Sequence, residues 1–206
     1  MFLLNSNLPN LSCKLRFIHA VPGAEAVDIY ANGSLVASNA SFGTLTEYVN
    51  LSPDTYIVEL FKAGTYDTPL LKENVTILPS SVYTVSIVTN NSKTSLFKLK
   101  DAGTKTNSEI SFLRFINLSP NSPLLTLSLK NSDPLFKEVE YLETTGYYPL
   151  SPGIYDFDLS FSDANIITKT LNNVSLVPGE FETLYVIGLL KGEPQLGYIL
   201  SKDGSK

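Results

Sequence analysis

The sequence is poor in the side chains on which disulfides, metal centres and most catalytic sites depend. Its 206 residues include one cysteine, one histidine and no tryptophan. The lone cysteine, Cys13, cannot close a disulfide within the chain. The lone histidine, His19, cannot build a multi-histidine metal site and has no evident base partner for a catalytic triad. We therefore expect no disulfide framework, no metal, no cofactor and no catalytic residue.

Charge is also scarce. Charged residues make up 17% of the chain, whereas about 25% is typical of soluble domains. The 15 basic and 20 acidic side chains give a net charge of -5, and the densest cationic run is Lys98–Leu99–Lys100. Neutralising nucleic-acid phosphates requires several convergent cations, so nucleic acid is excluded as a partner. The hydrophobic content of 43% is ample for a packed core.

Long apolar runs are missing as well. The stretch 184–190 is one of the longest and has the length of a strand, far below the roughly 20 residues of a membrane-spanning helix. The first seven residues carry no basic side chain, and their apolar run ends after four residues. We therefore expect a soluble chain without a membrane span or a classical signal peptide.

The first twelve residues are predicted to form an extended arm. Residues 1–12 are rich in Asn, Ser and Leu, and Pro9 lies among them, which disfavours a helix. Two interpretations stay open: a frayed tail, or a strand that docks on this or a neighbouring subunit. In the second interpretation the apolar anchors of the assembly arm are its leucines, Leu3, Leu4, Leu8 and Leu11.

An internal repeat determines the expected organisation of the chain. Residues 15–22 recur as residues 113–120, with five of eight positions identical, and two shorter blocks recur in the same order. Those blocks are 51–56 with 150–155, and 75–79 with 174–178. We expect two homologous domains. The predicted boundaries are arm 1–12, first repeat 13–101, linker 102–109, second repeat 110–202 and C-terminal tail 203–206.

Each repeat is predicted to be all-β. Apolar and polar residues alternate along 155–161, a period of two that is typical of a half-buried strand. The same alternation recurs through both repeats, with turn signals such as Asn32–Gly33, Pro53–Asp54 and Pro178–Gly179 between the runs. No window predicts a capped amphipathic helix. The pattern favours an immunoglobulin-like or transthyretin-like β-sandwich in each repeat.

The first repeat resembles a known family. The motifs that carry the resemblance are Leu15–Pro22, Val27–Gly33, Phe42–Gly43 and Tyr48. In their order and spacing they resemble the bacterial domain of unknown function 4397 family over residues 13–100. The resemblance implies β-sandwich modules in tandem, mostly on bacterial surface or secreted proteins, with no established catalysis. Since no leader is visible here, deposition on a spore by the mother cell is our hypothesis for surface location.

The second repeat is interpreted as a diverged copy of the same module. It has other residues at several of the positions that carry the resemblance. Asn117 stands for His19, Thr126 for Asp28, Ser128 for Tyr30, Tyr141 for Phe42 and Tyr147 for Tyr48.

Arginine is used at only two positions, which are equivalent in the two repeats. Arg16 and Arg114 are the only arginines, while every other cation is lysine. The planar fork of a guanidinium makes contacts that lysine cannot imitate. The acid that we find at matching positions is Glu59 in one repeat and Asp158 in the other. We predict two cross-strand structural pairs, Arg16 with Glu59 and Arg114 with Asp158, with inter-subunit and ligand contacts as alternatives.

Two other polar residues form a candidate cluster in the first repeat. A histidine held by a carboxylate has a pKa suited to acid–base chemistry, which makes His19 and Asp28 the only dyad worth weighing. The second repeat keeps neither residue. We therefore expect His19 to be a half-buried group bonded to a backbone carbonyl or to Asp28.

These observations favour a protein without enzymatic activity. We expect a structural or interaction protein of the bacterial cell or spore surface, although the cytoplasm is not excluded, with itself or other surface proteins as partners. The alternative is a carbohydrate- or ligand-binding, adhesin-like module, which would display a cluster of exposed aromatic and polar side chains. Tyr147–Tyr148 is the best aromatic candidate for glycan binding, but the chain lacks tryptophan.

Overall fold

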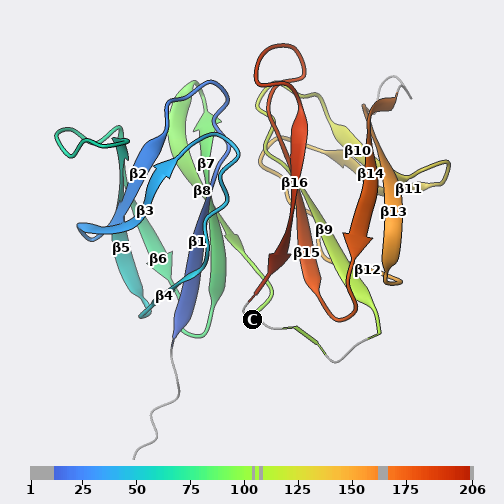
Figure 1. Ribbon diagram of the computed structural model, residues 1–206, viewed down its shortest axis with the longest axis horizontal. Helices are drawn as coiled ribbons and strands as arrows, with labels where there is room; N and C mark the ends of the chain where they lie inside the picture. Colours follow the sequence, from blue (N-terminus) through green and yellow to red (C-terminus); the bar gives the residue numbers. More distant parts are fainter. Residues whose placement is uncertain (1–11, 104, 107–108, 162–166, 205–206) are drawn as a thin grey trace, which may run out of the picture.

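The computed structural model describes residues 12–103, 105–106, 109–161 and 167–204. These residues contain sixteen β-strands, which form four four-stranded sheets. Figure 1 shows that the sheets make two sandwiches side by side, one from each half of the chain. The predicted all-β class and the tandem sandwiches are confirmed. The arm leucines Leu3, Leu4, Leu8 and Leu11 lie outside the described residues.

The first sandwich contains eight strands in two sheets. The inner sheet has the order β4-β1-β7-β8, and the outer sheet has the order β3-β2-β5-β6. The strands are β1 (Cys13–His19), β2 (Val27–Ala31), β3 (Ser34–Ala40), β4 (Val49–Leu51), β5 (Asp54–Lys62), β6 (Leu71–Ile77), β7 (Val82–Asn90) and β8 (Lys93–Lys100).

The second sandwich repeats this topology. Its inner sheet has the order β12-β9-β15-β16, and its outer sheet has the order β11-β10-β13-β14. In each inner sheet the first strand of the sandwich pairs in parallel with the seventh. The strands are β9 (Ser111–Asn117), β10 (Leu125–Leu129), β11 (Pro134–Val139), β12 (Tyr148–Leu150), β13 (Gly153–Phe161), β14 (Ile167–Leu176), β15 (Phe181–Ile187) and β16 (Gly197–Asp203).

One predicted boundary is wrong. Asp203 was placed at the start of a C-terminal tail, but it is the last residue of β16 and is only 5% exposed. The pairing of β16 with β15 extends to this residue, which lies opposite Phe181. Asp203 therefore belongs to the second sandwich.

Each sandwich encloses its own apolar core. Leu15 and Phe17 of β1 point into the first core, and Leu113 and Phe115 of β9 point into the second. Because side chains alternate along a strand, the intervening residues of β1 and β9 face the other way. In a single sandwich that second face would be in contact with water.

Here the second face is covered by the other sandwich. The two inner sheets lie toward the middle of the molecule and the two outer sheets at its opposite ends (Figure 1). A third apolar cluster joins the halves, and across the same contact the Tyr141 hydroxyl donates to the Thr89 carbonyl oxygen at 2.6 Å. The buried members of this cluster are Ile18, Ala20, Val88 and Leu99 from the first sandwich and Ile116, Leu118, Tyr185 and Ile187 from the second.

No stretch among the described residues forms a helix that is long and apolar enough to cross a membrane.

The linker is fixed against the second sandwich by a contact between Thr106 and a glycine. The Thr106 amide donates to the Gly179 carbonyl oxygen at 2.9 Å. Gly179 has a φ of +75°, and a Cβ at this position would lie 2.2 Å from the Thr106 carbonyl oxygen. Only glycine fits this turn without moving the linker backbone.

We expect Gly179→Ala to destabilise the protein more than Gly64→Ala. Gly64 has a similar φ of +77° but no heavy atom within 4 Å of the added Cβ. The control therefore measures the cost of the left-handed backbone alone, about 1 kcal/mol, and Gly179→Ala adds the clash with Thr106. Urea unfolding of both variants measures the difference, and equal losses would show that the linker is not held there.

Candidate functional site

The most highly connected group of polar side chains lies between the two sandwiches. Arg16 on β1 reaches across to the second sandwich, where its Nη2 lies 2.5 Å from Asp203 Oδ1. In return, Arg114 on β9 reaches the first sandwich, where its Nη2 lies 2.7 Å from Asp101 Oδ1. In both ion pairs the arginine side chain is 4% exposed and the aspartate side chain 0%. We call this group the arginine–aspartate network.

Each guanidinium uses its whole fork. The Nε atoms of Arg16 and Arg114 donate to Thr84 and Thr183 of their own inner sheets, at 2.8 and 2.9 Å. Their Nη1 atoms donate across the interface, Arg16 to the Lys202 carbonyl oxygen at 2.9 Å and Arg114 to the Lys100 carbonyl oxygen at 2.8 Å. A lysine ammonium has neither the number of donors nor the planar geometry for these bonds. The contacts explain why arginine occurs at these two positions.

Two tyrosines extend the network in equivalent ways, each within its own sandwich. The Tyr48 hydroxyl donates to Asp101 Oδ2 at 2.8 Å, and the Tyr147 hydroxyl donates to Asp203 Oδ2 at 2.7 Å. Each ring also lies against the arginine of its own sandwich, with the guanidinium carbon 4.4 Å from the centre of the Tyr48 ring in one case. The corresponding distance to the Tyr147 ring is 4.6 Å. These are cation–π contacts of buried guanidinium groups.

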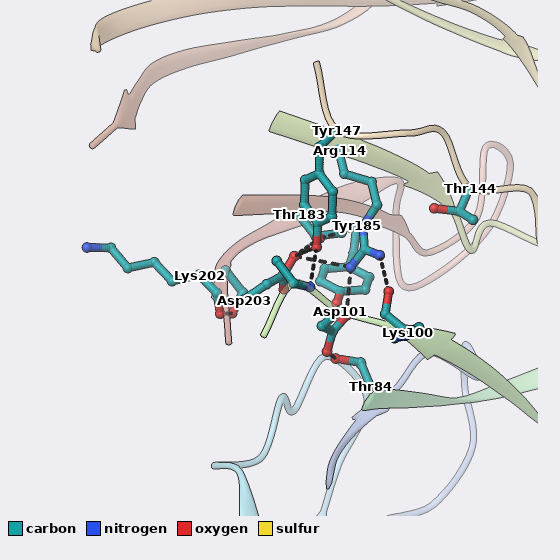
Figure 2. A network of polar contacts seen from close by, with 12 residues as sticks. Thr84, Lys100, Asp101, Arg114, Thr144, Tyr147, Thr183, Tyr185, Lys202 and Asp203 are labelled. Atoms are coloured by element: carbon teal, nitrogen blue, oxygen red, sulfur yellow. Dashed lines mark hydrogen bonds and ion pairs between the residues drawn. The ribbon is translucent and has the colours of Figure 1, made fainter. Parts of the chain in front are cut away.

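The two carboxylates are saturated with donors. Asp101 accepts bonds from Arg114, Thr84 and Tyr48. Asp203 accepts bonds from both arginines and from Tyr147 and Thr183. Figure 2 shows Arg114, Tyr147, Thr183 and Thr84 converging from both sandwiches on Asp101 and Asp203. The network is electrically balanced, with two cations and two anions, and its acceptors are already occupied.

Burial dominates the protonation behaviour of this site. It raises the pKa of Tyr48 and Tyr147 well above the usual range of a phenol, and that of Tyr185 to about 12. Burial, followed by repulsion from Asp101, raises the pKa of Asp203. For Arg114, burial acts to lower the pKa, but Asp203 and other neighbours raise it. The tyrosines are therefore neutral hydrogen-bond donors and the arginines are charged.

The network departs from symmetry at one pair of equivalent positions. Tyr185 on β15 is fully buried, and its hydroxyl oxygen accepts a long hydrogen bond of 3.4 Å from Arg16 Nη2. The equivalent residue of the first sandwich is Ser86 on β7, because Ser86 follows Thr84 at the same spacing as Tyr185 follows Thr183. The Ser86 hydroxyl is buried and has no hydrogen-bond partner among the residues that the structure describes. The two halves have therefore specialised around a shared contact.

The predicted pairs of Arg16 with Glu59 and of Arg114 with Asp158 are wrong. Glu59 and Asp158 lie on β5 and β13, which belong to the outer sheets. The outward faces of the two sheets in a sandwich point in opposite directions, so these carboxylates cannot reach arginines on the inner sheets. Glu59 instead contacts Lys72 at 2.7 Å, and Asp158 accepts a bond from the Thr170 hydroxyl at 2.8 Å.

The true partners were missed although a sequence signal existed. A Lys-Asp pair stands at the end of the last strand in both repeats: Lys100 ends β8 and Asp101 follows it, while Lys202–Asp203 ends β16. The connection between β15 and β16 is longer than the connection between β7 and β8. The longer connection shifts Asp203 out of the register that aligns the rest of the repeat. A comparison that allowed for this insertion would have matched the two aspartates.

His19 and Asp28 are not bonded to one another. His19 is 1% exposed, and its Nδ1 accepts a bond from the Val21 amide at 3.4 Å. In the second sandwich Asn117 Oδ1 accepts the equivalent bond from the Ser119 amide at 3.0 Å. Burial lowers the pKa of His19. The shared bond gives His19 a structural role that asparagine also performs.

Asp28 holds the backbone of an edge strand in place. Its two carboxylate oxygens accept bonds from the amides of Asn39, at 2.7 Å, and Gly64, at 2.8 Å. Asn39 has a positive φ of 51° within an irregularity of the β2–β3 pairing. Thr126 accepts the matching bond from Glu138 in the second sandwich. His19 and Asp28 therefore do not form the predicted polar cluster, and each makes its own local hydrogen bonds to the backbone.

The aromatic groups do not form the flat platform expected for glycan stacking. Tyr30, Phe61 and Tyr66 lie together on the outer sheet of the first sandwich, but their rings are inclined to one another by 81°, 50° and 33°. Tyr147 is part of the arginine–aspartate network, while Tyr148 is 45% exposed. No group of three or more His, Cys, Asp or Glu side chains within the described part of the chain has metal-binding geometry.

The chain belongs to the family defined by the domain of unknown function DUF4397, whose model matches residues 13–128. The match covers the first sandwich and continues through most of β10. It confirms the resemblance seen in the sequence. That the second sandwich is a separate, diverged copy of the family domain stays a prediction. A search of curated proteins found no match.

We expect Arg16→Lys to lower the free energy of unfolding by about 2 kcal/mol, because several charge-assisted hydrogen bonds are lost inside the protein. Arg114→Lys should behave alike, since its contacts are equivalent. The matched control is Glu59→Gln, which removes a partly exposed ion pair with Lys72 and should cost less than about 1 kcal/mol. Chemical denaturation measures all three. If Arg16→Lys lowered the free energy of unfolding no more than Glu59→Gln does, the guanidinium contacts would not be structurally important.

His19 makes a second test possible through pH. Burial lowers its pKa in the folded protein, so below a pH of about 6.5 the unfolded chain binds the proton more readily. The free energy of unfolding of the wild type should therefore decrease as the pH falls below that value. His19→Asn, which copies Asn117, removes this contribution. Denaturation curves at several pH values should show a shallower decrease for the variant, whereas parallel curves would contradict the burial of His19.

Proposed function

We propose that the protein is a non-enzymatic structural or interaction protein in which two sandwiches act as one rigid unit. The observation that carries the proposal is the reciprocal exchange of arginines between the sandwiches. Arg16 pairs with Asp203 and Arg114 with Asp101, each at a side-chain exposure of 4% or less. Buried ion pairs tolerate little displacement, because a separated partner would be left charged and without a hydrogen bond.

The chemistry of the network supports a structural role. Catalytic carboxylates, tyrosines or arginines need an open position at which a substrate can bind. Here the oxygens of Asp101 and Asp203 already accept bonds from protein donors. His19, the residue best suited to proton transfer at neutral pH, has a lowered pKa and a backbone partner.

Contacts with other proteins would then use the outer parts of the molecule. The two outer sheets face away from the interface at opposite ends of the molecule (Figure 1). A rigid unit with two separated faces is suited to building a layer or linking two partners. A bacterial cell or spore surface is the location that we propose, on the basis of the family resemblance, with copies of the chain or other surface proteins as partners.

The oligomeric state of the full-length protein tests this proposal. We expect light scattering and negative-stain microscopy to show discrete oligomers or filaments. Deletion of residues 1–12 should abolish them if the arm adds a strand to a neighbouring sheet. The control is the same deletion examined by circular dichroism, which should leave the β signal unchanged. A monomer at every concentration, with and without the arm, would contradict self-assembly.

A further inference from the structure

The outer faces of the two sandwiches have diverged at four equivalent positions. In each outer sheet, two adjacent cross-strand pairs point away from the core, because their neighbours along the strands are core residues. In the first sandwich the pairs are Asp28 with Phe61 and Tyr30 with Glu59. In the second sandwich they are Thr126 with Ser160 and Ser128 with Asp158. Hydroxyl side chains have thus taken the place of aromatic rings.

The aromatic rings fill this face in the first sandwich. Tyr66, from the β5–β6 connection, lies over the sheet with its ring centre 4.7 Å from that of Tyr30 and 4.5 Å from that of Phe61. In the second sandwich Ser128 and Ser160 stand where Tyr30 and Phe61 would be. Serine cannot occupy the same volume, so the face is hollowed at this point.

The hollow is a cavity of about 400 Å³, within the usual range for small-molecule sites. Hydroxyl groups, a carboxylate and a cation are among the side chains that line it. The lining residues that matter here are Thr126, Ser128, Asp158, Ser160 and Lys137.

The carboxylate in the cavity, that of Asp158, lacks the counter-ion that its equivalent in the first sandwich has. Glu59 in the first sandwich contacts Lys72 at 2.7 Å. At the cross-strand position of Lys72 the second sandwich has Thr170, whose hydroxyl donates to Asp158 Oδ1 at 2.8 Å. Within the described residues, Asp158 forms no ion pair and its Oδ2 accepts no hydrogen bond, although the residue is only 7% exposed. An enclosed carboxylate with unused acceptor capacity is suited to a ligand that donates hydrogen bonds.

We propose that this cavity of the second sandwich binds a neutral sugar residue. Ligand hydroxyls would donate to Asp158 and exchange hydrogen bonds with Ser128 and Ser160, each of which can both donate and accept. An anionic ligand would be repelled by Asp158, and a cationic one would meet Lys137. The site lies on an outer sheet, so it is separate from the arginine–aspartate network.

Nuclear magnetic resonance titration of the full-length protein tests the proposal, with glucose, galactose, mannose and N-acetylglucosamine as the probes. We expect at least one of them to cause saturable shifts of amide signals in β10 and β13. Asp158→Asn should weaken binding at least tenfold, because it removes the charge while its amide oxygen can still accept the bond from Thr170. The matched control is Glu59→Gln, the equivalent change in the first sandwich, which should bind as the wild type does.

A second variant closes the cavity with residues that this fold already accommodates. Ser128→Tyr combined with Ser160→Phe copies the first sandwich and should abolish the shifts while preserving the spectrum of the folded protein. The proposal is overturned if none of the four sugars shifts these signals, or if Asp158→Asn and the cavity-filling variant bind like the wild type. Saturable binding of ethanolamine or Ca²⁺ in place of the sugars would also overturn it, since either would identify a cation site.

Discussion

The burial of two guanidinium groups between the sandwiches is the constraint on which the rest of the structure depends. A buried charge must be paired and fully hydrogen-bonded to be tolerated. Each arginine forms its shortest carboxylate contact with the other sandwich: Arg16 depends on Asp203 of the second, and Arg114 pairs with Asp101 of the first, while it also contacts Asp203 of its own sandwich at 3.1 Å. The two inner sheets must therefore face one another in one register. Buried ion pairs add little net stability compared with apolar packing, so the network fixes the orientation of the halves while the apolar cluster around Ile18 and Ile116 supplies the hydrophobic contact.

The interface between the sandwiches resembles that of a twofold symmetric dimer, although both halves belong to one chain. Each sandwich contributes an arginine, a threonine, a tyrosine and an aspartate, and each set completes the other, as in an isologous interface. Tyr185 and Ser86 show that the symmetry is no longer complete. The outer sheets have diverged further, with aromatic packing around Tyr30 on one and a hydroxyl-lined cavity around Asp158 on the other. The two halves thus make equivalent contributions to the contact between them, whereas their outer faces differ.

Much of the fold could be predicted from the sequence, because strands and repeats leave periodic patterns. The special use of arginine at positions 16 and 114 was also visible. Their partners were not, for two physical reasons. Alternation along β1 shows that Arg16 points away from its own core, but it cannot show that a second sandwich covers that face. The longer connection before β16 also moves Asp203 out of the repeat register. Glu59 and Asp158 match in the repeat register and therefore look like the arginine partners in the sequence, although they lie on the outer sheets.

The central claim is that the arginine–aspartate network makes the two sandwiches a single cooperative unit. Differential scanning calorimetry of the full-length protein tests it most directly. If the halves unfold together, the protein shows one transition whose calorimetric enthalpy equals its van't Hoff enthalpy. Two resolved transitions, or a calorimetric enthalpy well above the van't Hoff value, would show that the sandwiches unfold independently and would contradict the claim.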